Sequence, residues 1–398
     1  MARKPKRVEA GSRRRVALVI ETSMASGRQI LRGIARYSRE CGPWALYHEP
    51  GHMQAGLPDW LRRWRGDGLI TRVRSAEVAD LLAGMSLPVV DVLDDFLHPK
   101  IAGVRVSNPG IARLAVEHFL DRGFREFAYC GIEGRRWSQL REEAFVEYVR
   151  AAGYGCEVYH LPRQETLPWY AETERERLAE FVRRLPKPGA ILACNDLAGQ
   201  RVLDACRRVD VAVPENAVVL GVDNDESLCE ISDPVLSSVD PAYAQIGYQA
   251  AAVLDRMMQG EPPPERELLW EPTEVIVRRS TDILAINDTD LAAAVRFIRD
   301  CACDGIGVAD VVRRVGISYS TLKRRFRDVF QRSIHDEIVR VRLERARELL
   351  ADTDLSLAVI ARRTGFQHQE SLGAVFKAQF GTTPGRFRRD YGSAPPDR

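Results

Sequence analysis

The 398-residue sequence has no run of about 20 apolar residues, the length that a helix needs to cross a bilayer. Its basic start is followed by only five apolar residues, 16–20, which is too few for a secretory signal. The eight cysteines form no CxxC pair and no regular framework, which favours free thiols in a reducing cytoplasm. We therefore expect a cytoplasmic protein with no contact to a membrane.

Patterns typical of catalysis are scarce as well. The sequence shows no phosphate-binding loop and no recognisable pair of nucleophile and base. We expect no catalytic residue, no metal ion and no cofactor. An enzyme that uses the carboxylates of Asp196 and Asp223 is the alternative interpretation.

Charge is divided unevenly along the chain, although the total is only +2. The net charge is +6 for residues 1–15, −10 for residues 16–289 and +6 for residues 290–398. A basic C-terminal region suits a polyanion, whereas the acidic central region does not. The basic residues 1–15 are expected to form a disordered tail, with an added DNA-binding arm as the alternative.

One helical unit occurs twice near the C-terminus. VADVVRRVGIS at residues 308–318 aligns with LAVIARRTGFQ at 357–367, and both contain Arg-Arg-x-Gly. Each predicts a short helix, a turn at glycine and a second helix, whose apolar residues recur every four positions. These residues are Leu322, Phe326 and Phe330 in the first copy and Leu372, Phe376 and Phe380 in the second.

The opposite faces of the two second helices carry polar side chains that can reach phosphates and base edges in a major groove. In the first copy these are Ser320, Lys323, Arg324 and Arg327, and in the second Gln369, Glu370, Ser371 and Lys377. Apolar residues between 334 and 349 predict a helix that connects the two copies.

These motifs, with Phe380-Gly381-x-Thr383-Pro384 after them, resemble the double helix-turn-helix domain of AraC-type transcription regulators. The resemblance covers about a hundred residues, which we place at 290–392. It implies binding to a double-stranded DNA operator, contact with RNA polymerase and activation of transcription. The second recognition helix departs from the family pattern, because Leu372-Gly373-Ala374 replaces its usual aromatic and polar residues.

From residue 16 onward, short β-branched runs alternate with helical segments, which is typical of parallel sheets covered by helices. Two α/β lobes fit in this length, and the return of the chain to the first lobe predicts a ligand cleft between them. This arrangement resembles that of periplasmic binding proteins. We expect this domain at 16–277, with one lobe from 16–108 plus 240–277 and the other from 109–239. Residues 278–289 are predicted to link it to the all-α domain.

The segments Ala193-Cys194-Asn195-Asp196 and Gly221-Val222-Asp223-Asn224 resemble the effector domain of LacI/GalR regulators. The order of a LacI-like effector domain followed by an AraC-like DNA-binding domain is similar to that of xylose operon regulators. The resemblance implies a small sugar effector, with a pentose such as xylose expected first, and a homodimer. It also matches Arg141 to the effector-contacting arginine of the LacI type.

Five residues are predicted to bind the ligand: Trp137, Arg141, Asn195, Asp196 and Asp223. Carboxylates and amides after strands can hold sugar hydroxyls in pairs, and a tryptophan can stack on a sugar ring. Structural roles are open for the same residues. Asn195 and Asp196 can cap the next helix, Trp137 can be a packing residue, and Arg141 can pair with a glutamate on its own helix. Control by a non-sugar ligand or by a protein partner is a further alternative.

Overall fold

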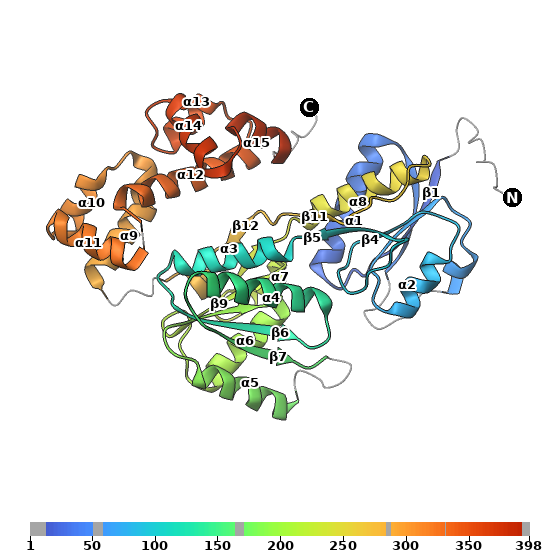
Figure 1. The fold of residues 1–398 in the computed structure, drawn as a ribbon, viewed down its shortest axis with the longest axis horizontal. Coiled ribbons are helices and arrows are strands. Elements are labelled where there is room, and N and C mark those ends of the chain that lie inside the picture. Colours follow the sequence, from blue (N-terminus) through green and yellow to red (C-terminus); the bar gives the residue numbers. More distant parts are fainter. Residues whose placement is uncertain (1–12, 51–58, 164–170, 284–287, 331, 392–398) are drawn as a thin grey trace. The chain divides into compact units, whose positions relative to one another are not determined.

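The computed structural model describes residues 13–50, 59–163, 171–283, 288–330 and 332–391 (Figure 1). The chain forms two compact units, one of residues 1–120 and 124–283, the other of residues 121–123 and 284–398. Residues 1–12 of the predicted tail at 1–15 lie outside the described residues. Arg14 already begins the first strand.

One lobe of the first unit contains a six-stranded sheet in which all neighbouring strands are parallel. Its order is β11 (Leu268–Trp270), β5 (Ala102–Val106), β4 (Val89–Asp91), β3 (Gly68–Thr71), β1 (Arg14–Val19) and β2 (Trp44–Glu49). Its helices are α1 (Ala25–Cys41), η1 (Asp59–Arg63), α2 (Ala76–Ala83) and α8 (Tyr243–Met258). Every residue of β3, β4 and β5 is buried, as expected for strands that are covered on both faces.

The other lobe contains a second six-stranded sheet. Its order is β12 (Glu274–Ile276), β10 (Ser237–Asp240), β9 (Ala217–Val222), β8 (Gly189–Ala193), β6 (Glu126–Ile132) and β7 (Cys156–Leu161). Its helices are α3 (Asn108–Leu120), α4 (Arg136–Ala151), α5 (Glu172–Arg184), α6 (Asp196–Arg208), α7 (Glu226–Glu230) and η2 (Arg279–Thr281). The predicted pair of α/β lobes is thus confirmed, and all strand pairs of the second sheet except β10–β12 are parallel.

Two boundaries differ from the sequence prediction. Strand β12 was expected to close the first lobe, but it pairs antiparallel with β10 and belongs to the second sheet. The predicted linker 278–289 also starts too early. Ser280 in η2 is fully buried, and its hydroxyl donates to the Val219 carbonyl over 2.6 Å, so the start of that segment is part of the second lobe.

Helices α1 and α8 pack closely against each other in the first lobe. A Cβ atom at Gly33 would lie 1.9 Å from the Ala244 carbonyl oxygen, and one at Gly247 would lie 2.1 Å from the Ile30 carbonyl oxygen. Because real Cβ atoms do not approach backbone oxygens so closely, these two glycines permit the contact between the helices. The packing sets α8, which begins at the cleft with Tyr243, against the sheet.

The second unit is helical (Figure 1). Its elements are α9 (Thr289–Cys301), η3 (Ala302–Asp304), α10 (Val308–Val315), α11 (Tyr319–Phe330), α12 (Ile334–Asp352), α13 (Leu357–Arg363), α14 (Gln369–Phe380) and α15 (Pro384–Tyr391). Both predicted helix-turn-helix copies are present, as α10–α11 and α13–α14. Gly316 and Gly365 adopt φ of 80° and 75° at the two turns, a conformation that glycine takes without strain.

The connecting helix α12 contributes to two separate hydrophobic cores. Its first part packs with α9, α10 and α11 around Leu322, Phe326 and Phe330, and its second part packs with α13 and α14 around Leu372 and Phe376. Ser333 starts this helix as an N-cap, because its hydroxyl accepts from the Asp336 N–H over 3.1 Å. The predicted apolar faces of both copies are therefore buried, and the opposite faces remain available to a partner.

Candidate functional site

A cavity in the first unit is lined by side chains of both lobes. Those of the first lobe include Glu21, Ser26, Arg72, Arg74, Asp94, Asp95 and Arg105, and those of the second include Arg135, Trp137, Arg141, Asn195 and Asp223. Tyr243, at the start of α8, also contributes. Four of these residues, Glu21, Arg72, Asn195 and Asp223, lie within two residues of the carboxyl end of a parallel strand, and such strand ends meet at one edge of a sheet.

Four of the five predicted ligand residues line this cavity: Trp137, Arg141, Asn195 and Asp223. Asn195 caps helix α6, since its side-chain oxygen accepts from the Ala198 N–H over 2.9 Å. The capping role and the place in the cavity wall are therefore compatible, because the amide NH2 group is left for another partner. Contact between any of them and a ligand stays a prediction.

Asp196, the fifth predicted residue, lies behind the lining. One of its carboxylate oxygens accepts from the Ser238 hydroxyl over 2.6 Å, and the other accepts from the Asp225 N–H over 2.8 Å. Burial raises the pKa of this carboxyl well above its ordinary value, and the negative charge of Asp223 raises it further. Asp196 thus ties α6 to neighbouring segments of its own lobe, and its geometry does not place it against a ligand.

Arg141 is almost fully buried, with 2% of its surface exposed. Its Nη2 and Nε atoms donate to the Asn108 side-chain oxygen over 3.0 and 3.3 Å, and Nη1 donates to the Cys194 carbonyl. Its guanidinium carbon lies 5.5 Å from the centre of the Trp137 ring. The printed hydrogen bonds of Arg141 thus go to Asn108 and to the Cys194 carbonyl and not to a glutamate of its own helix, which was the structural alternative.

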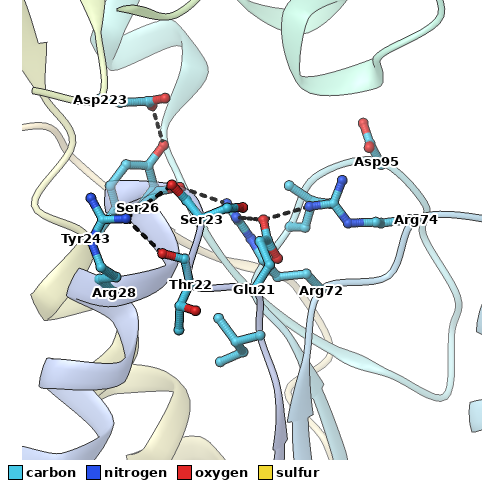
Figure 2. Close-up of polar contacts among 12 residues, drawn as sticks. Glu21, Thr22, Ser23, Ser26, Arg28, Arg72, Arg74, Asp95, Asp223 and Tyr243 are labelled. Atoms are coloured by element: carbon cyan, nitrogen blue, oxygen red, sulfur yellow. Dashed lines mark hydrogen bonds and ion pairs between the residues drawn. The ribbon is translucent and has the colours of Figure 1, made fainter. Parts of the chain in front are cut away.

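Asp223 comes directly after a strand and lines the cavity. It follows β9 with an unusual φ of 110°, and its Oδ1 atom accepts from the Tyr243 hydroxyl over 2.7 Å (Figure 2). Burial raises the pKa of its carboxyl, against the lowering effect of Arg141. A polar ligand that offers hydroxyl donors can compensate such a buried carboxylate.

A polar cluster in the first lobe was not predicted residue by residue. Glu21 follows β1 and receives hydrogen bonds from Arg72 and Arg74, which follow the neighbouring strand β3 (Figure 2). Burial opposes ionisation of Glu21, but the two guanidinium groups outweigh it, so the pKa of this carboxyl is lowered. The available signal was the Arg-x-Arg that follows a predicted buried strand.

In the second unit, the predicted DNA-contacting residues lie on the exposed faces of α11 and α14. Ser320, Lys323, Arg324 and Arg327 are exposed on α11, whereas Arg325 turns back and donates to Asp288 over 3.0 Å. On α14 the exposed residues are Gln369, Glu370, Ser371 and Lys377. The first of these faces is strongly basic and the second carries one charge of each sign.

The part of the chain that the structure describes holds neither a candidate metal site nor a candidate membrane span. No group of three or more histidine, cysteine, aspartate or glutamate side chains there is arranged to hold a metal ion. No described helix is long and apolar enough to traverse a bilayer.

Models of three known protein families match successive parts of the chain. Residues 15–102 match the XylR N-terminal domain, residues 116–281 a periplasmic binding protein-like domain, and residues 311–390 a helix-turn-helix domain. The periplasmic binding protein-like match includes α8 and β11 of the first lobe as well as the second lobe, and the helix-turn-helix match lies within the helical unit.

Relatives match along nearly the whole chain. The xylose operon regulatory protein of Escherichia coli strain K12 is 33% identical over 384 residues, 94% of this chain and 97% of the relative. That of Haemophilus influenzae is 28% identical over 94% of this chain and 98% of the relative. The solved structure of the xylose-binding transcription activator XylR is similar with a TM-score of 0.61 and 31% identity, covering 96% of this chain and all of that one.

Proposed function

This chain belongs to the family of xylose operon regulators, and from that premise we propose that a small sugar held in the cavity of the first unit sets its affinity for DNA. The chain is a sugar-controlled regulator of transcription with a helix-turn-helix domain. One observation carries the proposal: polar side chains at the strand ends of two separate sheets line the same cavity. A ligand that bridges them stabilises the closed lobes.

The names of the relatives make D-xylose the first sugar to test. In the proposed complex, Asp223 accepts hydroxyl donors, the Asn195 amide donates, and Trp137 covers one face of the ring. Arg141 positions this wall through Asn108 and the Cys194 carbonyl. If a non-sugar ligand or a protein partner controls the chain instead, these residues need not contact a sugar.

On the DNA side, we propose that the exposed faces of α11 and α14 enter the major groove of an operator. The protein would act in the cytoplasm as a homodimer, whose two DNA-binding domains bind two half-sites. It would activate transcription by contacting RNA polymerase. Support comes from the duplicated helix-turn-helix and its basic surface. Closure of the lobes changes DNA binding only as far as the sugar binds the closed state more tightly than the open one.

The proposal excludes turnover of the sugar. An enzyme built on Asp196 and Asp223 lacks one of its two carboxylates at the cavity surface, because Asp196 is engaged by Ser238 and Asp225. Of the two residues, only Asp223 lines the cavity.

Calorimetry of the full chain against a sugar panel, followed by operator binding with and without each sugar, tests the proposal. We expect saturable binding, an unaltered sugar after incubation and a changed operator affinity. Conversion of the sugar supports the enzyme instead. Binding of no sugar at all, with the chain folded, supports control by another ligand or by a protein partner.

A further inference from the structure

The loop of residues 223–225, directly after β9, contacts the first lobe through its first and last residues. The Asp223 Oδ1 atom accepts from the hydroxyl of Tyr243, which begins α8 of that lobe, over 2.7 Å (Figure 2). The Asp225 carboxylate lies 3.7 Å from the guanidinium group of Arg28 in α1. Both contacts join the second lobe to the first, so movement of one lobe against the other changes them.

Asn224, the middle residue of this loop, binds the segment by which the chain leaves the second lobe. Its side-chain oxygen accepts from Nη2 of Arg278 over 2.8 Å. Arg278 is also fixed to the second lobe, because its Nη1 donates to the Leu236 carbonyl over 3.1 Å and its backbone N–H donates to the Ser237 hydroxyl over 2.8 Å. The first unit ends shortly afterwards, at Ile283, and the chain continues into the helical unit. Arg278 thus connects the loop to the end of the sugar-binding unit.

The backbone of the loop makes it sensitive to these contacts. Asp223 and Asn224 have φ of 110° and 48°, values that are uncommon for residues other than glycine. Such conformations cost free energy and persist only where the surrounding contacts stabilise them. Loss of the contacts with Tyr243 and Arg28 therefore weakens the loop conformation in which Asn224 meets Arg278.

We propose that the 223–225 loop and Arg278 couple closure of the sugar cavity to DNA binding, with Arg278 as a positioning residue outside the cavity lining. The inference rests on the proposed function, because it names the route by which a sugar in that cavity acts. Sugar bound at Asp223 favours the closed lobes, and the closed lobes favour the loop conformation that engages Arg278. Coupling through such a hydrogen-bonded network is reciprocal, so operator DNA changes the sugar affinity by the same factor as the sugar changes the operator affinity.

The test is Arg278→Gln in the full-length protein, with D-xylose, L-arabinose and D-ribose as probes. Calorimetry identifies the sugar that the wild type binds most tightly, and an operator selected from random DNA by the wild type is titrated with and without it. The variant should bind this sugar within about threefold of the wild-type affinity. The sugar should change the operator affinity by about fivefold or more in the wild type and by less than about twofold in the variant. Operator DNA should likewise change the sugar affinity of the wild type only.

Arg279→Gln is the matched control, because Arg279 is the next residue, is exposed and loses the same charge, and it should keep the wild-type response. Asn224→Gly removes the contact from its other side, and glycine adopts a φ of 48° without strain. Since both substitutions break one hydrogen bond, the double variant should lose no more of the response than Arg278→Gln alone. Circular dichroism checks each fold, and Asn224→Gly decides alone where Arg278→Gln is unfolded.

Three results overturn the inference and leave the proposed function standing. The first is a wild-type response of operator binding to sugar in folded Arg278→Gln or Asn224→Gly. The second is an equal loss of response in Arg278→Gln and Arg279→Gln, because the charge of the segment and not the contact would then matter. The third is a loss of sugar affinity of about tenfold in Arg278→Gln, which would place Arg278 in sugar binding. A wild type that binds none of the three sugars, or binds one with no change in operator affinity, defeats the proposed function as well.

Discussion

Asp223→Asn should weaken sugar binding without lowering the stability of the free protein. Asparagine keeps the size of the side chain and tolerates the positive φ of 110° at this position, where alanine would be strained. The Tyr243 hydroxyl, 2.7 Å from Oδ1, can still donate to an amide oxygen. Only the negative charge is removed from the cavity wall.

The expected loss follows from this geometry. A hydrogen bond to a charged acceptor is about twice as strong as one to a neutral acceptor. Replacing one with the other should cost about 1–2 kcal/mol of sugar affinity, or about 5- to 30-fold. Burial raises the pKa of Asp223, so the charged form is disfavoured in the folded chain, and the neutral amide should leave the thermal midpoint of the free protein unchanged or higher.

Calorimetry with the best-binding sugar and a thermal melt without sugar measure the two effects. Asp210→Asn is the control, because Asp210 is an exposed aspartate of the same lobe with φ of 54°. A lower midpoint together with unchanged sugar affinity would refute the reasoning, since Asp223 would then be structural. Equal results for both variants would do the same.

Three further predictions concern DNA and pH. Arg324→Ala should lower the binding free energy by ~1–3 kcal/mol at one operator base pair, whereas Arg327→Ala should weaken binding to all sequences alike. Titrations with specific and random DNA measure both effects. Equal losses of affinity on both DNAs for Arg324→Ala would contradict a base-reading role. A fragment of residues 284–398 should bind DNA with log affinity falling linearly with log salt, and a folded fragment without affinity at low salt would be inconsistent with this. Burial raises the pKa of Asp91 to about 6 beside Arg105, so the folded chain binds this proton more readily than the unfolded chain. Stability should therefore fall from about pH 4 to about pH 6, by roughly 3 kcal/mol at most, and urea titrations of Asp91→Asn should lack that component of the slope.

The two recognition helices are expected to contribute unequally to DNA affinity. Helix α11 exposes three basic side chains, Lys323, Arg324 and Arg327, whereas α14 exposes Glu370 together with Lys377. Gly373 and Ala374 add no polar contact on α14. This agrees with the departure from the family pattern that the sequence showed there.

Most of the secondary structure and both helix-turn-helix copies were predictable from the sequence. Alternating buried runs and four-residue periodicities are local, so they specify strands and helices without knowledge of the partners. The same holds for Asp223 and Asn195, which each come directly after a predicted strand. Burial of Phe326 and Phe376 also followed from their spacing alone.

The partners of each element were decided only by the tertiary structure. Strand β12 has the same sequence pattern whichever sheet it joins, and its pairing with β10 follows from the path of the chain. Asp196 follows a strand just as Asn195 does, but Ser238 and Asp225 draw its side chain away from the cavity. The cluster of Glu21, Arg72 and Arg74 joins residues about fifty positions apart. They meet because β1 and β3 are neighbours in the sheet, and strand order depends on long-range packing that no local pattern encodes.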